Sequence, residues 1–134
     1  MKPQFIHLRL HTEYSLSDGI VRIPKLVDQC AEYEMPAVAV TDLNNLFGLI
    51  KFYNRAEDSG VKPIVASDVW IADTEGIAVT PLVLIARNDK GYLNLCQLIS
   101  NTYSKNSGNV SPSISRQDLK KKSEGLIALS GGKD

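Results

Sequence analysis

The sequence predicts an α/β fold in which mostly parallel strands alternate with flanking helices. Short apolar runs alternate along the chain with longer segments whose apolar residues recur at helical spacing. The run at residues 36–42 is almost continuously apolar, which is typical of a strand covered on both faces. Strands and helices that alternate in this way usually form right-handed crossovers around a parallel sheet. The length of 134 residues predicts a single core.

The first half of the chain predicts two strands and two helices. A strand is expected at residues 4–12, and the strand at 36–42 follows the first helix. That helix, at 22–35, has apolar residues at i, i+3, i+4 and i+7, with a proline in its first turn, where the missing N–H costs least. The second helix is expected at 44–60, with an asparagine at its start as N-cap and Gly60 in the left-handed position at its end.

The second half predicts three more strands, two more helices and two connecting segments. Asp89 is the candidate N-cap of the long helix, and Ser115 with Asp118 resembles a capping box on the short one. The expected order is strand 62–72, turn 73–76, strand 79–88, helix 89–105, loop 106–113, helix 115–122 and a last strand with its exit at 125–134.

Composition excludes several classes of function. Fifteen basic and fifteen acidic side chains cancel, so the chain lacks the net positive charge typical of nucleic-acid binding. No apolar run is long enough to span a membrane, and the N-terminus does not resemble a signal peptide. Cys30 and Cys96 lie on apolar helical faces and are expected to be buried thiols in a reducing compartment. We therefore expect a cytoplasmic protein without membrane contact.

The stretch HLRLHTEYSLSDG, residues 7–19, concentrates polar groups near the end of the first expected strand. Residues two apart share one face of a strand, so His7, Arg9 and His11 are expected to point the same way. Sites in α/β folds lie at the carboxyl ends of the strands. Three acidic side chains are also expected near such ends, namely Asp18, Asp42 and Asp68.

Imidazole and carboxylate groups suit zinc, manganese or iron, but this spacing does not by itself predict a metal site. His7 and His11 are separated by about 13 Å on a strand, too far to share one ion. Arg9 between them cannot donate a lone pair and would repel a cation. From the residues alone, a single histidine is more often structural, Asp18 is more often a turn residue, and Asp42 fits a helix cap equally well. They indicate a polar pocket at the strand ends.

Five blocks in this order carry a resemblance to a known family. They are HLRLHTEYSLSDG, MPAVAVTDLNNLFGLIKFY, GVKPIVASDVW, ARNDKGYLNLCQLIS and EGLIALSGG. Together they closely resemble the N-terminal PHP (polymerase and histidinol phosphatase) domain of bacterial replicative DNA polymerase III alpha subunits. The resemblance implies a distorted (β/α)7 barrel with a metal cluster at the C-terminal ends of its strands. Residues 1–134 would be the N-terminal portion of that domain, within a larger multidomain polymerase chain.

Compared with metal-binding members of the family, this sequence lacks several ligands. H-x-H-T reads Arg9-Leu10-His11-Thr12 here, and T-D-H-G reads Thr41-Asp42-Leu43-Asn44. The resemblance implies that His11, Asp18 and Asp42 are kept and that Asp68 replaces a glutamate. Four ligand positions are lost, at Arg9, Leu43, Pro81 and Gly132.

The resemblance therefore implies a degenerate, non-catalytic PHP domain for which no cofactor is expected. Retained carboxylates that are buried need partners, so we expect Arg9 to pair with Asp42 or Asp68. The expected role is a scaffold for the polymerase and a docking surface for the proofreading exonuclease subunit and other replicase subunits. The parent chain would be a DNA-directed DNA polymerase, a nucleotidyltransferase of DNA replication that uses Mg²⁺ and contacts DNA through later domains.

Two alternatives remain open from the sequence. One is a metal-dependent phosphoesterase, either a 3′–5′ exonuclease or a pyrophosphatase. It would hold Mn²⁺ or Zn²⁺ weakly at His11, Asp18, Asp42 and Asp68, with Arg9 available to hold a phosphate. The other is a stand-alone protein that reuses the fold. Whatever its function, the chain is expected to favour self-association through an open sheet edge at the last strand.

Overall fold

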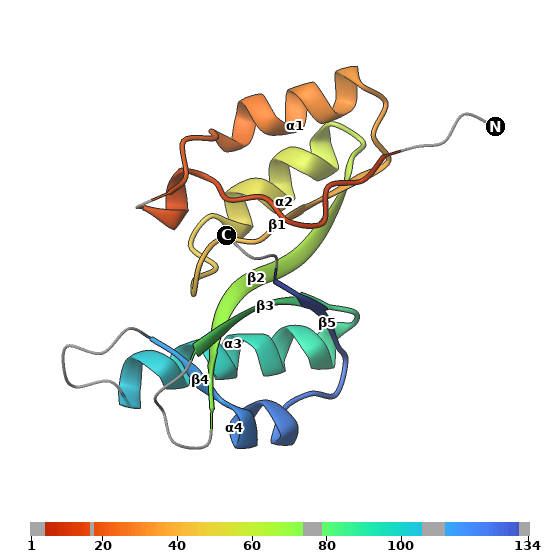
Figure 1. Ribbon diagram of the computed structural model, residues 1–134. Coiled ribbons are helices and arrows are strands. Elements are labelled where there is room, and N and C mark those ends of the chain that lie inside the picture. Colours follow the sequence, from red (N-terminus) through yellow and green to blue (C-terminus); the bar gives the residue numbers. More distant parts are fainter. Residues whose placement is uncertain (1–4, 17, 74–78, 106–111, 132–134) are drawn as a thin grey trace. The chain divides into compact units, whose positions relative to one another are not determined.

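The computed structural model describes residues 5–16, 18–73, 79–105 and 112–131 (Figure 1). The chain divides into two compact units, residues 1–66 and 67–134. Within the described ranges, no helix is both long and apolar enough to cross a membrane.

The first unit contains two helices, a short strand and the beginning of a long one. The 3-10 turn η1 (Glu13–Ser15) precedes α1 (Ile23–Glu32), β1 (Ala37–Val40), α2 (Leu49–Asp58) and β2 (Lys62–Ala72). β1 pairs in parallel with β2, in a register that runs from Ala37 opposite Lys62 to Val40 opposite Val65. All four residues of β1 are buried, as the continuous apolar run predicted.

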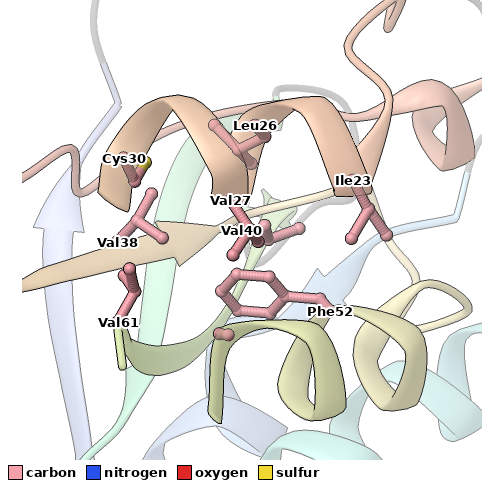
Figure 2. Close-up of a cluster of buried hydrophobic side chains, with 9 residues drawn as sticks. Ile23, Leu26, Val27, Cys30, Val38, Val40, Phe52 and Val61 are labelled. Atoms are coloured by element: carbon pink, nitrogen blue, oxygen red, sulfur yellow. The ribbon is translucent and has the colours of Figure 1, made fainter. Parts of the chain in front are cut away.

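The core of the first unit packs α1 and α2 against β1 (Figure 2). Phe52 of α2 and Val27 of α1 are fully buried and lie close to Val40 of the strand. The complete cluster is Ile23, Leu26, Val27, Cys30, Val38, Val40, Phe52, Ala56 and Val61. The apolar residues of α1 recur at i, i+3, i+4 and i+7, which explains why this segment forms a helix with one buried face.

The strand expected at residues 4–12 is wrong for the part that the structure describes. Residues 5–11 carry no regular strand, and Thr12 forms only an isolated parallel bridge with Val21. The backbone still bonds to β1 and to the residue after it, because the carbonyls of His7 and Leu10 accept from Ala39 (2.9 Å) and Thr41 (2.8 Å). Between these two bonds the segment advances three residues, from His7 to Leu10, while the opposite chain advances only two, from Ala39 to Thr41. A regular ladder of period two therefore cannot form.

The expected start of α2 is also wrong. The helix begins at Leu49, with Gly48 as N-cap and no capping side chain. Asn45 accepts a hydrogen bond from the backbone N–H of Phe47 at 3.1 Å, which is a local asparagine turn before the helix. The end of the helix is as predicted, because Gly60 has φ of +71° directly after the C-cap Ser59.

The second unit contains the end of β2 and two helices with three further strands. These are β3 (Val79–Ala86), α3 (Asp89–Lys105), β4 (Ile114–Ser115), α4 (Arg116–Lys121) and β5 (Leu126–Ser130). The end of β2 pairs in parallel with β4, and β3 pairs antiparallel with β5. The strand path ends at β5, where the sequence predicted an edge. Most of the predicted turn at 73–76 and most of the loop at 106–113 lie outside the described residues.

The helix starts of the second unit follow capping chemistry. Asn88, not the predicted Asp89, caps α3, because its side-chain oxygen accepts from the backbone N–H of Gly91 at 2.9 Å. Ser115 caps α4 as predicted, accepting from the N–H of Asp118 at 3.1 Å. The fold class is confirmed as mixed α/β, with a mostly parallel sheet and flanking helices.

Candidate functional site

The site predicted in the first unit is built around a closed loop at residues 12–21. Thr12 bridges to Val21, and the backbone N–H of Glu13 donates to the carbonyl of Val21 at 2.9 Å. Gly19 is required for this closure, because a Cβ atom there would stand 1.7 Å from the carbonyl oxygen of Thr12. Backbone contacts therefore hold the two ends of the loop, near Thr12 and Val21, next to each other.

Asp42, which follows β1, binds the start of this loop at Thr12 and Ser15. Its Oδ1 atom accepts hydrogen bonds from the backbone N–H of Thr12 at 2.6 Å and the hydroxyl of Ser15 at 2.8 Å. Its Oδ2 atom accepts from the hydroxyl of Thr12 at 2.7 Å. Asp42 is 2% exposed and Thr12 is fully buried. These donors fill three of the roughly four acceptor positions that a carboxylate offers.

The residues after Asp42 extend the same network. The backbone N–H of Leu43 donates to the Ser15 hydroxyl at 3.1 Å, so this serine both donates and accepts. Asn44 has φ of +52°, a left-handed conformation that asparagine tolerates better than most residues. Glycine, which stands at this position in the T-D-H-G motif, adopts that conformation without steric cost. Asn45 donates to the carbonyl oxygen of Tyr14 at 2.9 Å.

His11 and Asp18, two of the predicted site residues, lie in contact with each other. The Nδ1 atom of His11 lies 2.9 Å from Oδ2 of Asp18, so the imidazole donates this hydrogen to the carboxylate. The His11 side chain is 17% exposed and that of Asp18 is 50% exposed. The structure thus places Asp18 in a defined contact with another of the predicted site residues.

The other predicted residues are distributed over both units. Arg9 is exposed and precedes the closed loop, while Leu43 is half-buried. In the second unit, Asp68 is buried within β2 and Pro81 is half-buried in β3. The carbonyl of Pro81 accepts from the backbone N–H of Gly131 at 3.3 Å. Gly132 lies outside the described residues.

The fit of a multinuclear metal cluster can be tested on the donor set. Among the residues that the structure describes, no three histidine, cysteine, aspartate or glutamate side chains form a group that could hold an ion. Asp42 is engaged with Thr12 and Ser15, and His11 with Asp18. A small pocket of about 10 Å³ touches Asp42, which is room for one water molecule at most. In the described residues, the retained donors Asp42 and His11 are thus engaged by protein groups.

Sequence reasoning missed the parts played by Thr12 and Ser15. Both are small hydroxyl residues in a stretch that was interpreted through its charged side chains. The signal that could have found them is the hydroxyl spacing, because Thr12 and Ser15 begin and end a single turn that faces one acceptor. Hydroxyl groups in such turns commonly satisfy buried carboxylates and backbone groups.

Solved structures share this fold. An amidohydrolase from Chromobacterium violaceum matches with a TM-score of 0.57 and 19% identity, over 74% of this chain and 33% of that one. A protein from Bifidobacterium adolescentis, described as a candidate metal-dependent phosphoesterase, matches with a TM-score of 0.54 and 19% identity, over 74% and 32%. At this level of identity the likeness shows the fold alone.

The chain belongs to the PHP domain family, which matches residues 7–134. It is similar to DNA polymerase III subunit alpha from Vibrio cholerae, with 46% identity over 132 residues, or 98% of this chain and 11% of the relative. The Pseudomonas aeruginosa subunit is 47% identical over 100% of this chain and 12% of its own length. The Escherichia coli subunit is 44% identical over 98% and 12%. The chain thus spans about an eighth of these relatives.

Proposed function

We propose that this chain is the N-terminal part of the PHP domain of a bacterial replicative DNA polymerase alpha subunit, acting in the cytoplasm in chromosomal DNA replication. Its role there is a structural scaffold and a docking surface for the proofreading exonuclease subunit. The site is degenerate and takes no cofactor, and the Mg²⁺-dependent polymerase chemistry belongs to later domains. Identity of 44–47% to three alpha subunits over nearly the whole chain supports this proposal.

One observation supports the proposal that the metal site is degenerate. Asp42, a residue kept from the metal-binding motif, is engaged by three protein donors from Thr12 and Ser15. The leucine side chain of Leu43 offers no lone pair, so the motif lacks the ligand that its histidine would supply. Hydrogen bonds around a site can orient ligands, but they cannot replace a missing donor atom. The carboxylate then has a structural use, which is to fix the loop at residues 12–21.

Arg9 completes the proposal. We keep the expectation that its guanidinium pairs with Asp42 or Asp68 and takes the electrostatic place of the metal ions. An arginine is suited to this because it is always charged and its donors match a carboxylate. Pro81 and Gly132 then stand where ligands are no longer needed.

The contact of His11 with Asp18 favours one alternative. A histidine oriented by a carboxylate is a common arrangement at metal sites and in general base catalysis. The alternative function is a metal-dependent phosphoesterase, an exonuclease or pyrophosphatase, in which His11, Asp18, Asp42 and Asp68 hold one Mn²⁺ or Zn²⁺ ion. The lost ligand positions make this the weaker candidate.

Metal content measured by elemental analysis separates the two functions. The scaffold function predicts less than about 0.1 equivalent of metal and no phosphodiester hydrolysis after incubation with Mn²⁺ or Zn²⁺. The double variant Arg9→His/Leu43→His restores two ligands and should increase metal binding. The matched control, Arg55→His/Leu93→His, makes the same substitutions at exposed positions of α2 and α3. One tightly held equivalent in the unchanged protein, with hydrolysis lost in His11→Ala, would overturn the scaffold function.

Docking is tested with a purified exonuclease subunit from one of the bacteria that carry the related alpha subunits. We expect the tagged chain to retain that subunit on a column at moderate salt. Retention should persist in His11→Ala, because the proposed docking does not use the old metal site. Failure to retain the subunit would contradict docking by these residues and leave the metal result unaffected.

A further inference from the structure

A basic groove on the first unit lies beside the loop at residues 12–21 and shares Glu13 with it. Its volume is about 330 Å³, and five residues line it, namely Glu13, Arg22, Pro24, Lys25 and Lys51. It joins the 3-10 turn η1, the start of α1 and the first half of α2. Pockets of about 300 Å³ and more are of the size that holds small organic ligands.

The charges in this groove are mostly uncompensated. Lys51 lies 3.5 Å from a carboxylate oxygen of Glu13, and its Nζ stands 5.7 Å from the centre of the Tyr14 ring. Neither Arg22 nor Lys25 forms an ion pair with any residue in the described part of the chain. Three cations and one anion give the groove a net charge of +2 in a chain whose total is zero.

The start of α1 adds to this positive field. Arg22 is its N-cap and makes no side-chain capping bond, and the first turn, Ile-Pro-Lys-Leu, carries no acidic residue. The free N–H groups in the first turn of a helix carry a partial positive charge, which favours anions. In α1, Ile23 and Lys25 have such groups and Pro24 has none. Two other exposed cations, by contrast, pair with a nearby carboxylate, Arg55 with Asp28 and Lys105 with Asp118.

We propose that this groove binds a polyvalent oxyanion, of which a phosphate group is the biological case. Arg22 offers a planar pair of donors that fits two phosphate oxygens, while Lys25 and Lys51 contribute point charges. Glu13 holds Lys51 in place when the groove is empty and competes with the ligand when it is filled. The proposal is independent of the scaffold function, because it uses none of the residues of the degenerate site.

The test is a calorimetric titration of the 134-residue chain with inorganic pyrophosphate at low ionic strength. We expect a dissociation constant below roughly 1 mM, weakened at least about tenfold in Arg22→Ala/Lys25→Ala. The matched control Arg116→Ala/Lys120→Ala removes the same charges from exposed positions of α4 and should bind as the unchanged protein does. Glu13→Gln should bind more tightly, because it removes the competing carboxylate, and this gain cannot arise from misfolding.

A second titration with a twelve-residue deoxythymidine oligonucleotide distinguishes the source of the phosphate. Binding of the oligonucleotide that the groove variant weakens and the α4 control does not would assign the groove to nucleic-acid backbone phosphates. Binding of pyrophosphate alone would assign it to a free or nucleotide phosphate. The proposal is overturned if neither ligand binds, or if both double variants weaken binding equally.

Discussion

An oxygen of the Asp42 carboxylate and the backbone nitrogen of Thr12 lie 2.6 Å apart, although thirty residues of sequence separate them. This hydrogen bond joins the end of β1 to the start of the loop at residues 12–21. The same carboxylate accepts from both the Thr12 and the Ser15 hydroxyl groups. A buried charge with this many donors is a structural element, because removing it would leave several buried donors without an acceptor.

Asp42→Ala should therefore reduce the free energy of unfolding by about 3 kcal/mol or more, since each buried unsatisfied donor costs about 1–3 kcal/mol. Urea denaturation monitored by circular dichroism measures this loss. Asp28→Ala is the control, because Asp28 is paired with Arg55 but its side chain is 52% exposed. An exposed pair of this kind contributes less than about 1 kcal/mol. Equal losses in the two variants would show that the hydrogen bonds of Asp42 do not stabilise the loop at residues 12–21.

Gly19→Ala should destabilise the first unit strongly, because the added Cβ atom would lie 1.7 Å from the Thr12 carbonyl oxygen and 2.5 Å from its carbon. Both atoms belong to the backbone, so no side-chain rotation relieves the clash. Gly60→Ala is the comparison, since no described atom lies within 4 Å of its Cβ and only its φ of +71° causes strain. We expect a loss of about 1–2 kcal/mol there and a larger one at Gly19. Thermal unfolding of both variants gives the order.

The pKa of Asp118 should be lowered mainly by Lys105. The Lys105 hydrogen bond is the largest cause, followed by that of Ser115. Both stabilise the charged carboxylate and so lower the pKa from its ordinary value of 3.8. A depressed pKa in the folded state means that the stabilisation is present above the unfolded value and is lost as the pH falls through the folded value. Carboxyl titration by NMR should show the pKa of Asp118 rising in Lys105→Met.

Lys121→Met is the matched control for that titration, because Lys121 acts on Asp118 through charge alone and is the smallest cause. Its effect on the Asp118 pKa should be smaller than that of Lys105→Met. The stability difference between Lys105→Met and the unchanged protein should also vanish at a pH below the folded pKa. A difference that persisted there would mean that Lys105 stabilises the fold by another route.

The two thiols should differ in reactivity. Burial raises the pKa of Cys30, which is 2% exposed, whereas Cys96 is half-buried on α3. Because the thiolate is the reactive form, an aromatic disulfide reagent should modify Cys96 at least about tenfold faster than Cys30. Cys30→Ser and Cys96→Ser assign the two phases, and denaturation should make the rates alike. Faster reaction at Cys30 would contradict its burial in the core.

Sequence reasoning was most accurate where local pattern and burial agree. The bounds of β2 and α3 match the predicted ranges, 62–72 and 89–105. Pro24 and Gly60 were placed correctly because each acts through its own backbone preference. The error at residues 4–12 arose because alternating polar and apolar residues predict a strand, whereas the register against β1 decides whether one forms.

By itself, the sequence determined the α/β class, the order of most elements and the family resemblance. These follow from local periodicity and residue identity, which act over one or two turns of chain. Only the tertiary structure decided that Asp42 bonds to Thr12 and Ser15, that His11 meets Asp18, and that β5 runs antiparallel to β3. Such contacts depend on which distant segments are brought together, and residue spacing along the chain does not contain that information.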